Sequence, residues 1–244
     1  MLSTDYSHVA NFTGYMRLVS DITREGPAKQ RILDIPAGNG LLSAKLRELG
    51  HDTVRADINQ ERPDYIVADL NARLPFADEE FDTVLCLEGI EHVLDPQALI
   101  GELCRIIKPG GRVVISTPNI QNVFSRLKVL CTGFYDQYGP WMCRQIAPGE
   151  LKDRGHIAPL TYLQMRYHLM LHGARVERVD GDKWKRKALI PFLLPFVLLG
   201  RIWSRTSMRD EPDADPRECA EVLRHMNSGA LLFSRSLIVT ARKG

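Results

Sequence analysis

Two carboxylates and an imidazole stand close together in the segment LCLEGIEHVLDP, residues 85–96. Glu88, Glu91 and His92 have the spacing i, i+3 and i+4, which places three side chains on one face of a helical turn. Such a trio could bind a divalent cation, or Glu88 and His92 could take part in catalysis directly, with His92 as a general base. The alternative is a plain helix start, in which an acid stabilises the first turn and His92 packs beneath it.

The elements that must position this trio follow a regular alternation. Short aliphatic or β-branched runs alternate with amphipathic helical patterns, which is typical of an α/β fold with a mostly parallel sheet and helices on both faces. Helical patterns cover residues 40–50, 96–111 and 159–173. Strands are expected at residues 31–35, 52–57, 64–69, 81–87, 111–117, 174–180 and 230–242. The trio therefore follows the fourth strand, at the carboxyl edge of the sheet, where open α/β folds bind ligands.

Length and composition limit the class of protein. A chain of 244 residues with 44% hydrophobic content is enough for one domain spanning 1–244. The formal net charge of +2 gives no overall field for nucleic acid, so no nucleic-acid partner is expected. Five cysteines, an odd number without metal-ligand spacing, favour a reducing compartment, and the N-terminus has no secretory pattern. The cytoplasm is the expected location.

The turn after the first strand carries the most specific chemistry. The strand RILDI runs into PAGNG and then a helix, so the backbone can approach a ligand closely at Gly38 and Gly40. The spacing differs from the three-glycine dinucleotide fingerprint, and Asp34 would repel a pyrophosphate. A carboxylate at that place instead suits a ligand that bears an ammonium group.

Two further acids end the next two strands. Asp57 can accept hydrogen bonds from both hydroxyls of a ribose, and Asp69 can receive the amino group of an adenine. An amine, a ribose and an adenine in that order describe S-adenosylmethionine.

Four motifs in this order resemble the class I S-adenosylmethionine-dependent methyltransferases: LDIPAGNG, ADIN, ADLNARLPFADEEFDTVLCLEGIEHV and ELCRIIKPGGRVVISTPN. The resemblance covers about residues 30–180 and the final strand, and the chain is similar to the branch of ubiquinone-biosynthesis O-methyltransferases. It implies a Rossmann-like seven-stranded sheet whose last strand is antiparallel, with an insertion before that strand. Pro36 stands where the family more often has glycine. The implied cofactor-binding residues are Asp34, Ala37, Gly38, Gly40, Asp57, Asp69 and Leu70.

The resemblance also bears on the metal. The pattern E-x-x-E-H is similar to the metal-binding motif of small-RNA 2′-O-methyltransferases, in which a further histidine downstream completes the site. His156, in DRGHIAP, is the candidate for that histidine, which makes Glu88, Glu91, His92 and His156 the expected metal ligands. Carboxylate and imidazole ligands suit magnesium, manganese or zinc. Many relatives with a plain EH at this place need no metal.

Three segments outside these motifs have their own patterns. Residues 119–158 are irregular and aromatic, which predicts a lid and acceptor pocket, and aromatic residues near Tyr15 predict, by analogy, an N-terminal helix over the cofactor. In the insertion 181–229, the stretch 183–209 has seven basic and no acidic residues around an apolar run that is too short to span a bilayer and is broken by prolines. It predicts attachment to an anionic membrane at its inner face, as related ubiquinone-pathway enzymes attach, or a homodimer interface.

The expected function is therefore O-methylation by S-adenosylmethionine of a hydroxyl on an amphiphilic or lipid-linked small molecule or sugar, assisted by a metal. Two alternatives stay open. One is a metal-independent N- or C-methyltransferase of a small metabolite. The other is a regulatory protein that binds the cofactor without catalysis, which Glu88, Glu91 and His92 argue against.

Overall fold

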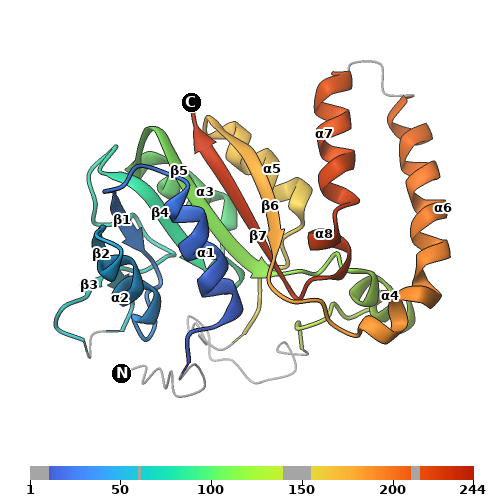
Figure 1. The fold of residues 1–244 in the computed structure, drawn as a ribbon, viewed down its shortest axis with the longest axis horizontal. Coiled ribbons are helices and arrows are strands. Elements are labelled where there is room, and N and C mark those ends of the chain that lie inside the picture. The colour runs from blue at the N-terminus through green and yellow to red at the C-terminus, as the bar shows by residue number, and fades with distance from the viewer. Residues whose placement is uncertain (1–10, 60–61, 140–154, 210–214) are drawn as a thin grey trace.

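The computed structural model describes residues 11–59, 62–139, 155–209 and 215–244 (Figure 1). In chain order the elements are α1 (Gly14–Arg24), β1 (Arg31–Asp34), α2 (Leu41–Glu48), β2 (Asp52–Asp57), β3 (Ile66–Val67), β4 (Phe81–Leu87), the 3-10 helix η2 (Ile90–His92), α3 (Pro96–Ile106), β5 (Ile107–Pro118), α4 (Val123–Thr132), α5 (Tyr162–Leu171), β6 (Ala174–Gly181), the 3-10 helix η4 (Lys187–Leu189), α6 (Ile190–Arg209), α7 (Pro216–Met226), α8 (Gly229–Phe233) and β7 (Ser236–Lys243).

The seven strands form one sheet in the order β3-β2-β1-β4-β5-β7-β6. β1 pairs in parallel with β2 and β4, β4 pairs in parallel with β5, and β7 runs antiparallel to both β5 and β6. The predicted Rossmann-like sheet with an antiparallel last strand is therefore confirmed. Because β1, β2 and β4 run in one direction, the acids that follow them meet at one edge.

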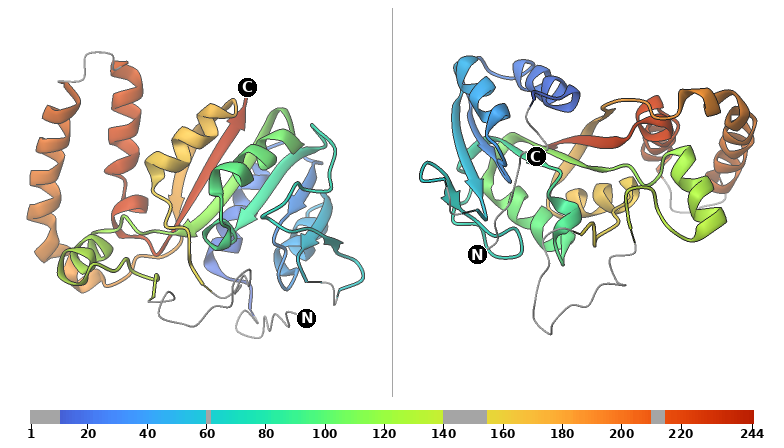
Figure 2. Two further views of the ribbon diagram at one scale, coloured as in Figure 1. Left: turned by 180° about the vertical axis from the view of Figure 1, so that it is seen from behind. Right: turned by 90° about the horizontal axis from the view of Figure 1, so that it is seen from below.

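Helices cover both faces of this sheet (Figures 1 and 2). One face packs against α3 and α5, and its core includes Leu33 and Val84. The other face packs against α1 and α2, where Ile32 and Leu85 are buried. Neighbouring residues of each strand thus enter opposite cores, as the period of two requires, and these strands are apolar on both sides.

Local capping explains where two of the covering helices begin. Asp95 precedes Pro96, the first residue of α3, and its carboxylate accepts a hydrogen bond from the Ala98 amide at 3.0 Å. Thr161 and Gln164 form a reciprocal capping box at the start of α5. The cap at Asp95 begins α3 directly after the segment that carries Glu91 and His92.

Several boundaries differ from those expected from the sequence. The third strand is confined to Ile66–Val67, and the residues predicted to begin the last strand form α8, so that β7 starts only at Ser236. The hydroxyl of Ser228 caps α8, which explains the helix. The segment 119–158 is not irregular throughout, because it contains α4, capped by Asn122. Its part 140–154 lies outside the described residues.

The insertion before β7 is helical rather than a loop. α6 is continuous over 20 residues with Pro195 inside it, so the expectation that prolines would break it was wrong. Pro191 falls in the first turn, where its missing amide costs no hydrogen bond. Within the described residues, the stretch Lys187–Thr206 is also long and apolar enough to cross a membrane by length and composition, contrary to the sequence expectation, and none of it is buried.

Candidate functional site

A cavity of about 300 Å³ opens at the carboxyl edge of β1, β2 and β4. This volume lies at the small end of the range for small-molecule sites. Its walls are the turn after β1, the end of β2, the segment after β3, the segment after β4 and the start of α1. The lining residues are Tyr15, Met16, Asp34, Ile35, Pro36, Ala37, Gly38, Asn39, Leu42, Asp57, Ile58, Ala68, Asp69, Leu70, Asn71, Leu87, Glu88, Gly89, His92 and Val93.

Asp34 lies at the base of this cavity and is almost fully buried. Burial raises the pKa of its carboxyl from an ordinary 3.8 to about 6, although the Ser43 hydroxyl donates a hydrogen bond to one carboxylate oxygen. When hydrogen bonds do not offset the cost of burying a charged carboxylate, that carboxylate favours a cationic ligand. Its surroundings therefore fit the ammonium group of a methionine moiety.

The glycine turn is held from two sides. The Gly38 amide donates to Asp57 Oδ2 at 2.9 Å, while the Asn59 amide donates to Asp57 Oδ1 at 3.0 Å. On the opposite side, the Tyr65 hydroxyl donates to the Gly38 carbonyl at 3.2 Å. Gly38 has φ 53°, in the region that favours glycine. Asp57 thus orients the turn from the end of β2 and lines the cavity, and its contact with a ribose stays a prediction.

Gly40 corrects the sequence interpretation. It does not line the cavity but caps the start of α2 with φ 75°. A side chain on Gly40 would overlap the Tyr65 hydroxyl, so the glycine at this position allows Tyr65 to contact the turn. Tyr65 itself was missed, because nothing in the sequence links a residue before the third strand to the turn after the first.

The far end of the cavity contains Ala68, Asp69, Leu70 and Asn71. Asp69 is exposed and accepts a hydrogen bond from the Asn71 amide at 2.8 Å. An apolar wall with an acceptor beside it suits an adenine, whose amino group is a donor. Asp69 and Leu70 line the cavity, and their contacts with a cofactor stay a prediction.

Three other lining residues are informative. Tyr15 and Met16 of α1 lie against the cavity, which agrees with the expected N-terminal helix near the cofactor, although residues 1–10 lie outside the described part of the chain. Gly89 was not anticipated. A Cβ added to Gly89 would lie 2.6 Å from Cδ of Pro36, so glycine allows the walls after β1 and β4 to meet.

Glu88 stands between the cavity and the rest of the site. Its φ of 51° is unusual for a residue with a side chain and prevents it from joining the helical turn of Glu91 and His92. Its carboxylate instead accepts a hydrogen bond from the Ser116 hydroxyl at 2.9 Å, and burial raises its pKa. The expectation that Glu88 shares one metal-binding face with Glu91 and His92 was therefore wrong.

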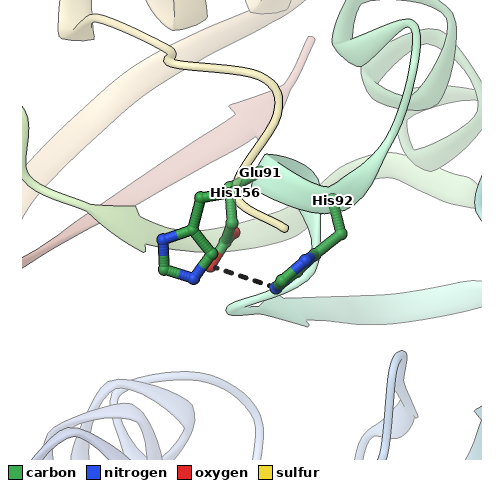
Figure 3. Close-up of side chains that lie close together, drawn as sticks. All are labelled: Glu91, His92 and His156. Carbon is green, nitrogen blue, oxygen red and sulfur yellow. Dashed lines mark ion pairs between the residues drawn. The ribbon is translucent and has the colours of Figure 1, made fainter. Parts of the chain in front are cut away.

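Glu91, His92 and His156 do come together (Figure 3). One potential ligand atom of each lies within 4.8 Å of the others, and His92 Nε2 is 4.0 Å from Glu91 Oε1. Glu91 is fully buried, and neither of its oxygens has a hydrogen-bond partner among the described residues. Burial, and then the charge of Glu88, raise the pKa of Glu91 well above its usual range. A cation at this position would compensate the buried charge.

The backbone explains why His156 reaches this place. The carbonyl of Glu91 accepts hydrogen bonds from the amides of Ile157 at 2.9 Å and Ala158 at 3.0 Å, and His92 Nδ1 lies 3.1 Å from the Gly155 carbonyl. The segment 155–158 is thus tied to η2. Burial and the neighbouring His92 lower the pKa of His156, so its neutral form, which can act as a ligand, is favoured.

The comparisons with known proteins agree with this geometry. A family model described as a methyltransferase domain matches residues 8–162, more than half of the chain. The chain therefore belongs to the class I S-adenosylmethionine-dependent methyltransferase family.

Among its relatives, a ubiquinone biosynthesis O-methyltransferase of Xanthomonas euvesicatoria pv. vesicatoria is 36% identical over 193 residues, covering 71% of this chain and 75% of that protein. A demethylmenaquinone methyltransferase of Renibacterium salmoninarum is 37% identical over 112 residues, covering 42% of this chain and 46% of that protein. The chain thus matches only about half the length of the latter.

Solved structures support the fold. A SAM-dependent methyltransferase of Archaeoglobus fulgidus superposes with a TM-score of 0.56 over 98% of this chain and 100% of that one. The identity between the two is 17%, so this likeness concerns the architecture alone.

Proposed function

We propose that this chain uses S-adenosylmethionine to methylate a hydroxyl group of an amphiphilic or lipid-linked small molecule or sugar, on the cytoplasmic side of a membrane. The observation that carries the proposal is the buried Glu91, with His92 and His156 beside it, next to a cavity suited to the methyl donor. When bound, S-adenosylmethionine supplies a methyl group on a positively charged sulfur.

The residues around the cavity would bind and orient the donor. Asp34 would hold its ammonium group, while Asp57 would hold both the ribose and the turn at Gly38. Contacts at the ammonium group and at the ribose would hold the donor on both sides of its methyl-bearing sulfur, and His92 lines the same cavity. Alignment of this kind is the main contribution that a protein makes to a transfer from so reactive a donor.

An acceptor hydroxyl needs one thing more, because its proton must leave. His92 lines the cavity and belongs to the cluster, so it stands at the boundary between donor and acceptor. A divalent cation held by Glu91, His92 and His156 would lower the pKa of the acceptor hydroxyl. Magnesium, manganese and zinc all suit these ligands.

Chelation and substitution test the metal. The wild type should bind manganese, measured by calorimetry without any acceptor, and the Glu91→Gln, His92→Ala and His156→Ala variants should lose this binding. His168→Ala, on α5, is the matched control and should bind as the wild type does. Methylation of a catechol with an isoprenoid tail should stop after chelation and return with one of the three cations.

A metal-independent reaction is the second candidate, because His92 alone could accept the proton. In that case catalysis would survive complete chelation and the His156→Ala substitution, but not His92→Ala. Methylation confined to amines or carbon acids would instead contradict the proposal of a hydroxyl acceptor. Calorimetry that shows no S-adenosylmethionine binding by the wild type would refute the proposed activity altogether.

A further inference from the structure

α6 exposes a continuous stripe of large apolar side chains. Phe192, Phe196, Leu199 and Trp203 have the spacing i, i+4, i+7 and i+11, which places them on one face of the helix, and they are 75%, 71%, 65% and 76% exposed. We call these four residues the outer stripe. A patch of this kind on a folded protein marks an interaction site.

The opposite side of the helix is turned toward the protein. Ile190, Leu193 and Val197 are only partly exposed, and their spacing places them on a different face from the outer stripe. Arg201 is tied to Asn227 at the end of α7 by two hydrogen bonds of 3.1 Å. The helix is therefore fixed against α7, and the outer stripe is the side that is left for a partner.

Charge indicates which partner. The stretch 183–209 carries seven basic and no acidic residues, although the whole chain has a formal charge of only +2. A second copy of this chain packed on the outer stripe would bring two such basic stretches together. An anionic lipid surface is complementary to them instead. The apolar run has an exposed tryptophan at each end, Trp184 and Trp203, and tryptophan is a residue type that favours the headgroup level of a bilayer.

Position connects this helix to the candidate site. Arg186, just before α6, lies over the ring of Phe124 in α4, 3.3 Å from its centroid. Arg186 and Lys185 also pair with Asp136 at 3.7 and 3.5 Å. The start of α6 is thus fastened to the segment after β5, and α4 and α6 lie side by side there in both views (Figures 1 and 2).

The same segment leads to the acceptor side of the site. Tyr138, two residues after Asp136, lies 5.3 Å from the ring of His156 and donates a hydrogen bond to the Ala158 carbonyl. Exposed apolar side chains are added to this region by α4 and by the second residue after its end, namely Leu127, Leu130 and Phe134. Exposed apolar side chains therefore lie in the same segment that holds the start of α6 and that leads on to His156.

We propose that the outer stripe and the exposed side of α4 dock on an anionic lipid bilayer, with α6 lying in the interface and the carboxyl edge of the sheet turned toward the lipid. α6 does not span the membrane, because Arg201 in its middle is held by the end of α7, and Glu218 and Glu221 of α7 pair with Arg166 of α5. Docking on the bilayer does not depend on methyl transfer. Only the part of the proposal that turns the carboxyl edge of the sheet toward the lipid rests on the proposed lipid-linked acceptor.

Vesicle binding of the complete chain, without donor or acceptor, tests this surface. The wild type should sediment with vesicles of phosphatidylcholine and phosphatidylglycerol in equal parts, less so with phosphatidylcholine alone, and less as salt rises. The variant Phe192→Ser/Phe196→Ser/Trp203→Ser should bind about tenfold or more weakly, because three large apolar side chains are lost. The matched control is Leu163→Ser/Tyr167→Ser/Leu171→Ser, on the exposed side of α5, which should bind as the wild type does.

Two results would overturn the proposal. One is equal binding of the outer-stripe variant and the wild type. The other is a wild type that ignores anionic vesicles and forms a dimer in light scattering, which the outer-stripe variant converts to a monomer, because a second copy then covers the stripe. Calorimetry of S-adenosylmethionine binding on the same variants separates this failure from a failure of the proposed activity.

Discussion

Replacing Asp34 by asparagine should move folding stability and cofactor binding in opposite directions. The carboxyl has a pKa of about 6 in the folded protein against an ordinary 3.8, because burial disfavours its charged form. A raised pKa of this kind contributes stability below about pH 4 that is lost as the pH rises through about 6. Two pH units correspond to about 3 kcal/mol, which the free protein forgoes at neutral pH.

Asp34→Asn removes that cost, and the Ser43 hydroxyl can still donate to the amide oxygen. At about pH 8 the melting temperature of the free protein should rise by about 6 °C or more, because ~1 kcal/mol corresponds to ~2 to 4 °C in a chain of this size. The affinity for S-adenosylmethionine should fall by about tenfold to a hundredfold, since a hydrogen bond to a charged group contributes ~1.5 to 3 kcal/mol.

Differential scanning calorimetry and titration calorimetry on the same samples provide both measurements. At about pH 4 the gain in melting temperature should disappear, because the wild-type carboxyl is then protonated as well. Asp69→Asn is the control, because this exposed carboxylate in the same cavity should shift the melting temperature by no more than ~2 °C. A variant at Asp34 that melts below the wild type at about pH 8, or binds the cofactor as tightly, would refute the reasoning.

The remaining predictions concern three local contacts. Gly89→Ala places a methyl group 2.6 Å from Cδ of Pro36 and should weaken S-adenosylmethionine binding in calorimetry, whereas unchanged affinity would mean that the walls can separate freely. Tyr65→Phe removes the hydroxyl that holds the glycine turn and should reduce the affinity for S-adenosylmethionine about fivefold, which corresponds to ~1 kcal/mol. This reduction in affinity should be the same at every pH. In the wild type, the Tyr162 hydroxyl lies 2.6 Å from Nδ1 of buried His225. Tyr162→Phe leaves this nitrogen without its partner and should lower the free energy of unfolding by ~1 to 3 kcal/mol in denaturant titrations, without changing cofactor affinity.

The strands and their common edge could be predicted from the sequence because parallel strands buried on both faces leave long aliphatic runs that few other structures need. Once those runs were located, the acids at their ends had to lie near one another. This is why Asp34, Asp57 and Asp69 all line the cavity. His156 is close to His92 for a different reason, since backbone hydrogen bonds to Glu91 tie the two segments together, and its position had been inferred by resemblance.

The errors arose where local pattern and tertiary context disagree. Glu88 has helical spacing to Glu91, but its backbone follows the hydrogen bonds of the Glu88 amide to Ser116 and leaves the helical region. The residues at the start of the predicted last strand are apolar enough for either a strand or a helix, and the cap at Ser228 makes them helical. Contacts such as that of Tyr65 with the glycine turn join distant segments, so no periodicity reveals them.

The position of β7 has a consequence for synthesis on the ribosome. β7 separates β5 from β6 in the sheet, and β6 reaches the sheet through β7. In the chain, however, the helical insertion lies between β6 and β7. β5 therefore leaves the ribosome before its partner β7 has been made. Until the insertion and β7 have been translated, the edge of β5 that includes Val113 and Ile115 is unpaired. An open apolar edge is a template for pairing with other chains. A nascent chain stalled within the insertion should therefore depend on chaperones, and a short insertion would shorten that interval.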